Sequence, residues 1–254
     1  MDHDDHLTFP AGPGRPPVGA AEVWCLHATT GEVEAATGMA GVLSTEERRR
    51  AAAFRRPADR DLYLVAHVGL RVLLGARMAL PPAEVELRRA ACPLCGDPHG
   101  RPETTTHPPL HFSLSHAHGM ALCALASSPV GVDVEASASA PDTSLVPHLH
   151  PAERTALERL PDEWQAKAFL DCWVRKEAYL KGIGTGLGVD PATVDVGLGP
   201  RHGDEESPDL RGWSLSPVPV PPTYSAAVAL LHPAPPVVHT RQASLASLTA
   251  VGRP

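Results

Sequence analysis

The sequence predicts an α+β protein of two subdomains of similar size, each combining helices with a short antiparallel sheet. Two observations lead to this expectation. Helical patterns are followed by strand patterns once in the first half of the 254-residue chain and again in the second half. The strand-like segments are short, apolar and separated by turn residues, which is typical of antiparallel strands.

The same patterns divide the chain into four parts. We expect a disordered tail over residues 1–20, an N-terminal subdomain over 21–127, a C-terminal subdomain over 128–233 and a flexible tail over 234–254. The first tail is rich in Pro, Gly and Asp, and the last contains Pro and Ser, compositions that seldom form a packed core. No internal sequence repeat is evident, so the similarity of the halves is an expectation from element order alone.

In the first half, Glu22–His27 is a predicted strand. Ser44 and Glu47 have the spacing of a capping box, which predicts a helix through Phe54. The remaining elements are a helix over Ala58–Met78, a strand over Val85–Arg89, a loop over Cys92–Pro109, and strands over Leu110–Ser115 and Met120–Ala126.

In the second half, a strand over Val130–Glu135 precedes two predicted helices. The first spans Pro151–Leu160; the second opens at an Asp162–Gln165 capping box, runs through Lys181 and ends at Gly182. Further strands are expected over Val194–Val196, Trp213–Val218 and Tyr224–Leu231.

Composition narrows the function classes. The formal net charge of −7 argues against general nucleic-acid binding, which favours a basic surface. No apolar run reaches the roughly 20 residues that span a bilayer, and no signal peptide is visible. The odd number of cysteines, five, favours a reducing, cytoplasmic setting.

Three short motifs carry candidate chemistry. In Gly131–Glu135, strand alternation places Asp133 and Glu135 on one face, where two carboxylates repel unless a cation lies between them. Oxygen ligands of this kind suit Mg²⁺. Taken alone, the motif is more typical of the exposed face of a strand.

The second motif is Trp173–Lys181, in which Glu177 and Lys181 are helix neighbours at i and i+4. Glu177 can be a third metal ligand and Lys181 can hold a phosphate, although an ordinary surface ion pair has the same spacing. The third motif is Ser115-His116 at a strand end, which can hydrogen-bond a phosphate or simply form a turn. No nucleophile elbow of the Gly-x-Ser-x-Gly kind is present.

Taken together and in this order, the three motifs resemble those of the Sfp-type 4′-phosphopantetheinyl transferases. The matching residues are Ser115-His116, Gly131–Glu135, Trp173–Lys181 and the glycine-rich stretch Gly182–Gly188. Gly100-Arg101-Pro102 resembles the family's Gly-Lys-Pro stretch, and the resemblance covers about Leu43–Asp195.

The resemblance implies a pseudo-dimer of two α+β halves that binds coenzyme A in the cleft between them. It implies Mg²⁺ as cofactor, held by Asp133, Glu135 and Glu177. The residues implied to bind coenzyme A are Arg55, Arg56, Arg101, Ser115, His116 and Lys181.

The implied reaction moves phosphopantetheine from coenzyme A to a serine of an apo acyl, peptidyl or polyketide carrier protein and releases 3′,5′-ADP. Glu177 is the first candidate for the general base and Glu153 the second, and Lys181 is expected to assist the leaving group. The implied protein is a cytoplasmic monomer of secondary metabolism that binds neither nucleic acid nor membrane. Two alternatives stay open: a metal-dependent phosphohydrolase, and a non-catalytic protein that binds coenzyme A or a carrier.

The segment Cys92-x-x-Cys95 lies outside these motifs. With His99 and His107 nearby it has some features of a zinc knuckle, but the irregular histidine spacing favours a plain loop.

Overall fold

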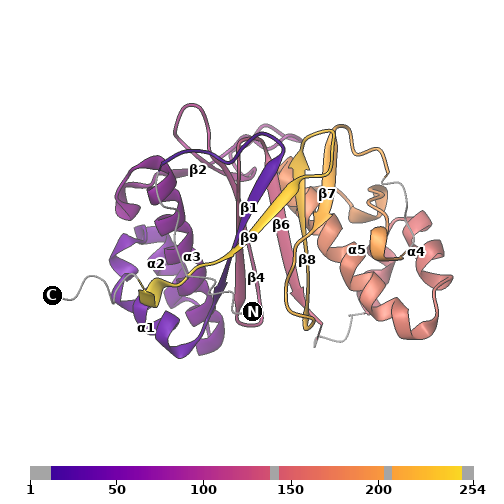
Figure 1. Cartoon of the computed structure of the whole chain (residues 1–254), viewed down its shortest axis with the longest axis horizontal. Coiled ribbons are helices and arrows are strands. Elements are labelled where there is room, and N and C mark those ends of the chain that lie inside the picture. The colour runs from indigo at the N-terminus through magenta and orange to yellow at the C-terminus, as the bar shows by residue number, and fades with distance from the viewer. Residues whose placement is uncertain (1–12, 138–142, 203–207, 248–254) are drawn as a thin grey trace, which may run out of the picture.

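Two sheets stand face to face in the middle of the molecule, and helices cover their outer sides (Figure 1). The computed structural model describes residues 13–137, 143–202 and 208–247. The first sheet has the order β4-β5-β1-β9 and the second the order β6-β8-β7, while β2 and β3 form a separate pair. The architecture confirms the predicted α+β class with short sheets.

The strands are short. Their bounds are β1 Ala20–His27, β2 Leu87–Arg89, β3 Pro102–Thr104, β4 His111–Ala117, β5 Met120–Ala126, β6 Val130–Ala136, β7 Trp213–Pro217, β8 Tyr224–Leu231 and β9 Val237–Gln242. All pairings are antiparallel except that of β1 with β9, which is parallel.

Each sheet carries one long helix. The α-helices are α1 Thr30–Gly38, α2 Thr45–Ala52, α3 Pro57–Met78, α4 Pro151–Glu158 and α5 Asp162–Ile183. Helices α1 to α3 lie beside the first sheet, and α4 and α5 lie beside the second (Figure 1). Helices α3 and α5 both have 22 residues, which matches the expectation of two comparable halves.

Strand alternation divides the core into three layers. On β1, Trp24 and Leu26 face the helices of the first half, whereas Val23 and Cys25 face the second sheet. A third layer packs α5 against the outer face of the second sheet. The central layer holds a cluster of apolar side chains from both sheets, so burial of the two sheets against each other helps to join the halves.

The N-terminus of α2 is built as the sequence predicts. The Glu47 amide donates to Ser44 Oγ at 3.2 Å, and Glu47 Oε2 accepts from the Ser44 amide at 2.8 Å. The same carboxylate accepts from Arg71 Nε at 2.8 Å. The capping box therefore also ties α2 to α3.

Helix α5 departs from the prediction at both ends. Its N-cap is Pro161 and makes no side-chain capping bond, so the predicted capping box is wrong. The helix ends on Gly184, whose φ of 82° is left-handed, and not on Gly182. Gly182 lies inside the helix, where a Cβ would meet the ring of Trp213 at 2.5 Å.

Other departures concern elements that the sequence does not reveal. Helix α1 and strand β3 were not expected, and Val194–Val196 forms no strand. Val237–Gln242, assigned to a flexible tail, pairs with β1 as strand β9. Ala20, at the end of the predicted disordered tail, begins β1. Residues 1–12 and 248–254 of the two predicted tails lie outside the described residues.

Candidate active site

A cleft of about 780 Å³ lies between the two halves. The first half contributes side chains from α2, α3, β4 and the loop around Gly100, and the second half contributes β6, α5 and the segment after α5. Seven of the sequence-predicted site residues line it. These are Arg101, Ser115, His116, Asp133, Glu135, Glu177 and Lys181.

Close packing of β6 on α5 brings the carboxylates together. A Cβ at Gly131 would lie 1.9 Å from the carbonyl oxygen of Ala178 and 2.5 Å from the amide nitrogen of Gly182. Only a glycine allows the strand backbone to approach the helix so closely. Asp133 and Glu135, further along the strand, thereby reach the same cleft as Glu177 and Lys181.

Ser115 links the two sheets at the floor of the cleft. Its Oγ donates to Asp133 Oδ1 at 2.8 Å and accepts from the Val134 amide at 3.4 Å. Ser113 Oγ accepts from the Val132 amide at 3.1 Å in the same way. Side-chain oxygens of β4 thus replace a backbone partner for the edge strand β6.

Lys181 completes this network. Its Nζ donates to Asp133 Oδ1 at 2.5 Å and to Ser115 Oγ at 3.0 Å. Asp133 is only 3% exposed, yet its other oxygen, Oδ2, has no hydrogen-bond partner among the described residues. A buried carboxylate oxygen in this state is costly, so it has capacity for a ligand.

Ionisation of the other two carboxylates, Glu135 and Glu177, costs free energy. Burial, with the negative charge of Asp133 added, raises the pKa of Glu135 to about 7. Burial and Asp133 also raise the pKa of Glu177. Lys181 offsets part of this repulsion in both cases. The carboxylates of Asp133, Glu135 and Glu177 line one cleft, although their oxygen atoms do not all lie within 4.8 Å of one another. Oxygen donors of this kind are the ligands that a hard divalent cation such as Mg²⁺ prefers.

Cationic groups from the first half occupy the opposite wall. Arg50, Arg89 and Arg101 line the cleft, and Arg101 Nη1 donates to the carbonyl oxygen of Gly182 at 3.2 Å. Partial desolvation lowers the pKa of His116, and the nearby His67 and Lys181 add to this effect. The wall can bind phosphate groups.

Three predicted site residues do not reach the cleft. Arg55 and Arg56 are exposed on the turn before α3 and are not part of its lining. Glu153 is 1% exposed and lies in the core of the second half, where it accepts from Lys176 Nζ at 2.9 Å and from the Val196 amide at 2.8 Å. Its carboxylate is fully occupied by these structural contacts.

The sequence reasoning missed several lining residues. They are Arg50, Phe54, Tyr63, His67 and Arg89. The rings of Tyr63 and His67 stack with centroids 3.9 Å apart, which gives this wall a flat aromatic part. The available signal was the one-turn spacing of Tyr63 and His67 on α3, which places both on one helix face.

A second, smaller pocket of about 310 Å³ contains none of the predicted site residues. Its polar groups bind one another: Asp171 accepts from Lys167, Ser225 and His202. These contacts satisfy the carboxylate, so the pocket offers less reactive chemistry than the cleft.

Comparison with known proteins agrees with this geometry. Residues 129–226 match the model of the 4′-phosphopantetheinyl transferase superfamily. The 4′-phosphopantetheinyl transferase HetI of Nostoc sp. is 31% identical over 182 residues, covering 70% of this chain and 73% of HetI. The 4′-phosphopantetheinyl transferase Sfp of Bacillus subtilis is 25% identical over 196 residues, covering 75% of this chain and 83% of Sfp. With the carboxylates of β6 and α5 at the matching motifs, this chain belongs to the 4′-phosphopantetheinyl transferase superfamily.

Proposed function

We propose that this protein transfers the phosphopantetheine moiety of coenzyme A to a serine of an apo carrier protein and releases 3′,5′-ADP. The observation that carries the proposal is that Asp133, Glu135, Glu177 and Lys181 all line the cleft between the halves. Membership of the transferase superfamily supports the same reaction.

Coenzyme A is the proposed occupant of the cleft. Its nucleotide and pyrophosphate carry several negative charges, and Arg101 and Lys181 supply cationic donors on opposite sides. Ser115 and His116 are proposed to contact the nucleotide end. Arg55 and Arg56, at the surface beyond the lining, have no part in this proposal.

Mg²⁺ is the proposed cofactor, and Asp133, Glu135 and Glu177 would hold it. The unpartnered Asp133 Oδ2 and the raised pKa values of Glu135 and Glu177 fit a cation site, because a bound cation removes both costs. When bound, the metal supplies positive charge that stabilises the negative charge developing on the transferred phosphoryl group.

The remaining chemistry is assigned to side chains of α5. Glu177 is proposed to accept the proton of the carrier serine, because it is the carboxylate of α5 that lines the cleft. Lys181 is proposed to stabilise the departing phosphate oxygen through its ammonium group. Glu153 is too enclosed to contact a substrate and is proposed to position Lys176 instead.

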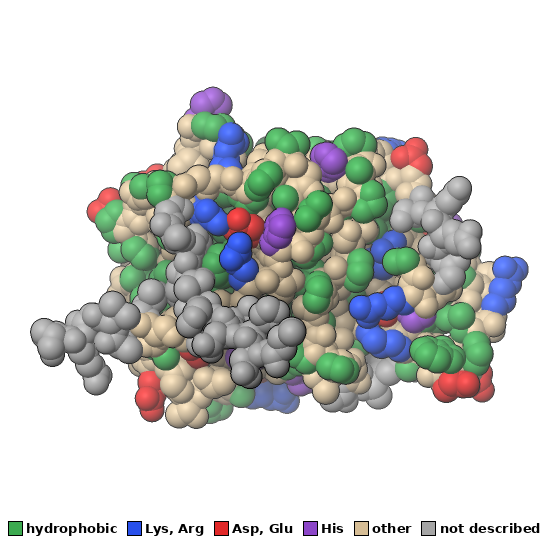
Figure 2. Space-filling model, viewed as in Figure 1, with side chains coloured by type: hydrophobic (Ala, Val, Ile, Leu, Met, Phe, Trp, Pro, Cys, Tyr) green, Lys and Arg blue, Asp and Glu red, His purple; other side chains and the backbone are tan. Residues whose placement is uncertain are grey.

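The proposed partners are acyl, peptidyl or polyketide carrier proteins, and the proposed setting is a monomer in the cytoplasm. All five cysteines are free, which suits a reducing compartment. None of the helices in the described part of the chain combines the length and the hydropathy of a membrane span. On the face in Figure 2, basic side chains lie in small groups among hydrophobic ones, unlike the continuous basic stripe of nucleic-acid binders.

Intact-mass spectrometry of an apo carrier protein tests the proposal. The carrier is incubated with the enzyme, coenzyme A and Mg²⁺, and we expect a mass gain of one phosphopantetheine. EDTA and Glu177→Gln should both abolish the gain, whereas Glu163→Gln, on an exposed residue of the same helix, should not. Consumption of coenzyme A without modification of any carrier type would contradict the transferase and favour a hydrolase.

A further inference from the structure

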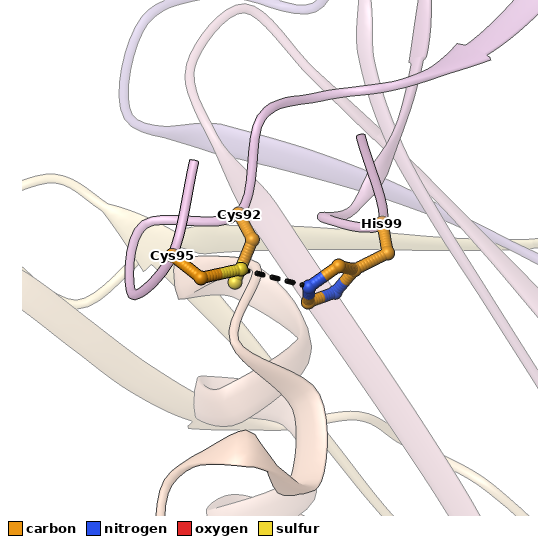
Figure 3. Close-up of side chains that lie close together, drawn as sticks. All are labelled: Cys92, Cys95 and His99. Atoms are coloured by element: carbon orange, nitrogen blue, oxygen red, sulfur yellow. Dashed lines mark hydrogen bonds between the residues drawn. The ribbon is translucent and has the colours of Figure 1, made fainter. Parts of the chain in front are cut away.

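The loop between β2 and β3 gathers three side chains that ligate soft metals. The ligand atoms of Cys92, Cys95 and His99 all lie within 4.8 Å of one another. The Cys95 sulfur and His99 Nε2 are 3.0 Å apart, and Figure 3 shows the imidazole directed at the two thiols. The irregular spacing of the histidines in the sequence therefore conceals a compact cluster.

The backbone of this loop turns back on itself after Cys92 through its own hydrogen bonds. The Gly96 amide donates to the Cys92 carbonyl oxygen at 2.8 Å, and the Cys92 amide donates to the Asp97 carbonyl oxygen at 2.7 Å. Gly96, with φ of 82°, allows the chain to turn back after Cys95. The turn holds one sulfur fixed and directs the second towards it.

Apolar burial does not explain the order of the turn. Cys92 is buried, but Cys95 and His99 are exposed and Leu94 is 56% exposed. Both thiols are free, so no disulfide closes the loop. A short, exposed loop of this kind gains little from the hydrophobic effect, so its cohesion depends on its backbone hydrogen bonds and on any ligand that its side chains bind.

We propose that Cys92, Cys95 and His99 bind a zinc ion. Two thiolates and one imidazole form a donor set that Zn²⁺ prefers over Mg²⁺, and tetrahedral Zn–S and Zn–N bonds place such atoms roughly 3.5–4 Å apart. Both thiols release their protons to solvent on binding. Asp97 is the candidate for the fourth ligand, because its Oδ2 lies 3.6 Å from the Cys95 sulfur.

The zinc site would fix one wall of the cleft. His99, Gly100 and Arg101 all line the cleft, directly after the ligand loop. The Gly100 amide donates to the Ala90 carbonyl oxygen at 2.9 Å, and the Ala90 amide donates to the Arg101 carbonyl oxygen at 3.0 Å. The metal would thus clamp the chain on which Arg101 reaches across to Gly182. This positioning role, unlike the site itself, rests on the proposed transferase function.

Metal analysis of the full chain tests the site without any substrate. The protein is purified with a thiol reductant, dialysed and analysed by inductively coupled plasma mass spectrometry, and we expect about one zinc per chain. Cys92→Ser, Cys95→Ser and His99→Ala should each lower the zinc content, whereas Cys25→Ala and His107→Ala, outside the cluster, should leave it unchanged. Wild-type protein with both thiols reduced and no zinc would overturn the proposal.

Cobalt substitution covers the case in which a variant fails to fold. Co²⁺ added to the zinc-free wild-type protein should give thiolate-to-cobalt charge-transfer absorption and the visible bands of a tetrahedral site. Zinc should remove these bands by competition. Bands of an octahedral, oxygen-ligated ion would show that the thiols do not bind metal and would also reject the site.

A kinetic comparison tests the positioning role separately. Cys95→Ser should raise the KM for coenzyme A by roughly tenfold at saturating Mg²⁺, with a smaller change in kcat, because Arg101 loses its fixed position. An unchanged KM in a zinc-free variant would refute the positioning role. Failure of all transferase activity would leave the zinc measurement intact, so the two proposals can fail independently.

Discussion

Gly131 of β6 faces Ala178 of α5 at a distance that excludes any side chain: a Cβ on residue 131 would meet the Ala178 carbonyl oxygen at 1.9 Å. Gly182, one turn further along α5, has the ring of Trp213 at 2.5 Å from its own Cβ position. The positions of Asp133 and Glu135 on the strand and of Glu177 and Lys181 on the helix therefore depend on two residues without side chains. Backbone packing sets the depth of the proposed metal site.

Gly131→Ala should disable the enzyme without changing any functional group. The added methyl must push β6 away from α5, which should lower the free energy of unfolding by about 3 kcal/mol. A shift of the carboxylates by a fraction of an ångström should lower activity by about a hundredfold. Carrier modification rates and urea denaturation measure the two effects. Gly31→Ala on α1, where a Cβ meets nothing within 4 Å, is the control and should keep both properties near wild type.

Lys181→Met should remove the cation that neutralises Asp133 while keeping most of the side-chain volume. Asp133 is nearly buried, and among the described residues its Oδ1 would keep Ser115 as its remaining partner. We expect kcat to fall by about 100- to 1000-fold, as when a charge-stabilising donor is removed. Steady-state kinetics with apo carrier measures the change. Lys167→Met, on the same helix but outside the cleft, should change kcat little; an equal loss in both variants would point to general damage of α5.

Glu153→Gln distinguishes a structural glutamate from a catalytic one. Lys176 is 0% exposed, and its ammonium is paired with this carboxylate at 2.9 Å. Removal of one charge from a buried pair should lower the free energy of unfolding by about 3 to 5 kcal/mol. Denaturant titration checks this loss, with Glu158→Gln on the exposed side of α4 as the matched control. Full stability combined with lost activity would instead restore Glu153 as a catalytic residue.

Glu47 should make stability fall in acid. Burial alone would raise its pKa, but hydrogen bonds from His67 and Ser44 and the charge of Arg71 outweigh burial and lower the pKa to about 2 from 4.5. Because the folded state binds this proton more weakly, the contribution is present above pH 4.5 and disappears as pH falls towards 2. At neutral pH it should be roughly 2 kcal/mol, less than the full shift because the carboxylate is partly solvated.

Chemical denaturation at a series of pH values tests this sign. Glu47→Gln should be less stable than wild type near neutrality, and the two curves should converge in acid. Glu34→Gln, an exposed residue of α1, should follow wild type at every pH. Curves for Glu47→Gln and wild type that stay parallel down to the lowest pH would show that the contribution of Glu47 does not depend on its charge.

The sequence predicts well where local signals are strong. Met120–Ala126 and Tyr224–Leu231 have the predicted bounds because turn residues flank continuous apolar runs. Helix α1 is missed because its small and polar residues form no clear apolar stripe. Strand β9 is missed because its side chains are largely exposed and its partner, β1, lies about two hundred residues earlier.

The candidate site likewise contains residues that the sequence predicts and residues that it misses. The carboxylates and Lys181 follow from strand and helix periodicity together with the family resemblance. Arg50 and Arg89 are missed because an arginine on a solvated face and one at a cleft have the same sequence pattern. Glu153 lies in the core because it pairs with the buried Lys176. The sequence does not predict this, because a lysine in a helix is ordinarily exposed.

The parallel pairing of β9 with β1 has a consequence for protein synthesis. Chains fold from the N-terminus as they leave the ribosome, and β1 emerges long before residues 237–242. Until then one edge of the first sheet has unpaired amides and carbonyls, a state that invites association with other chains. The nascent protein thus exposes this edge from the time that β1 pairs with β5 until β9 has been synthesised, and chaperone demand should depend on how quickly β9 arrives.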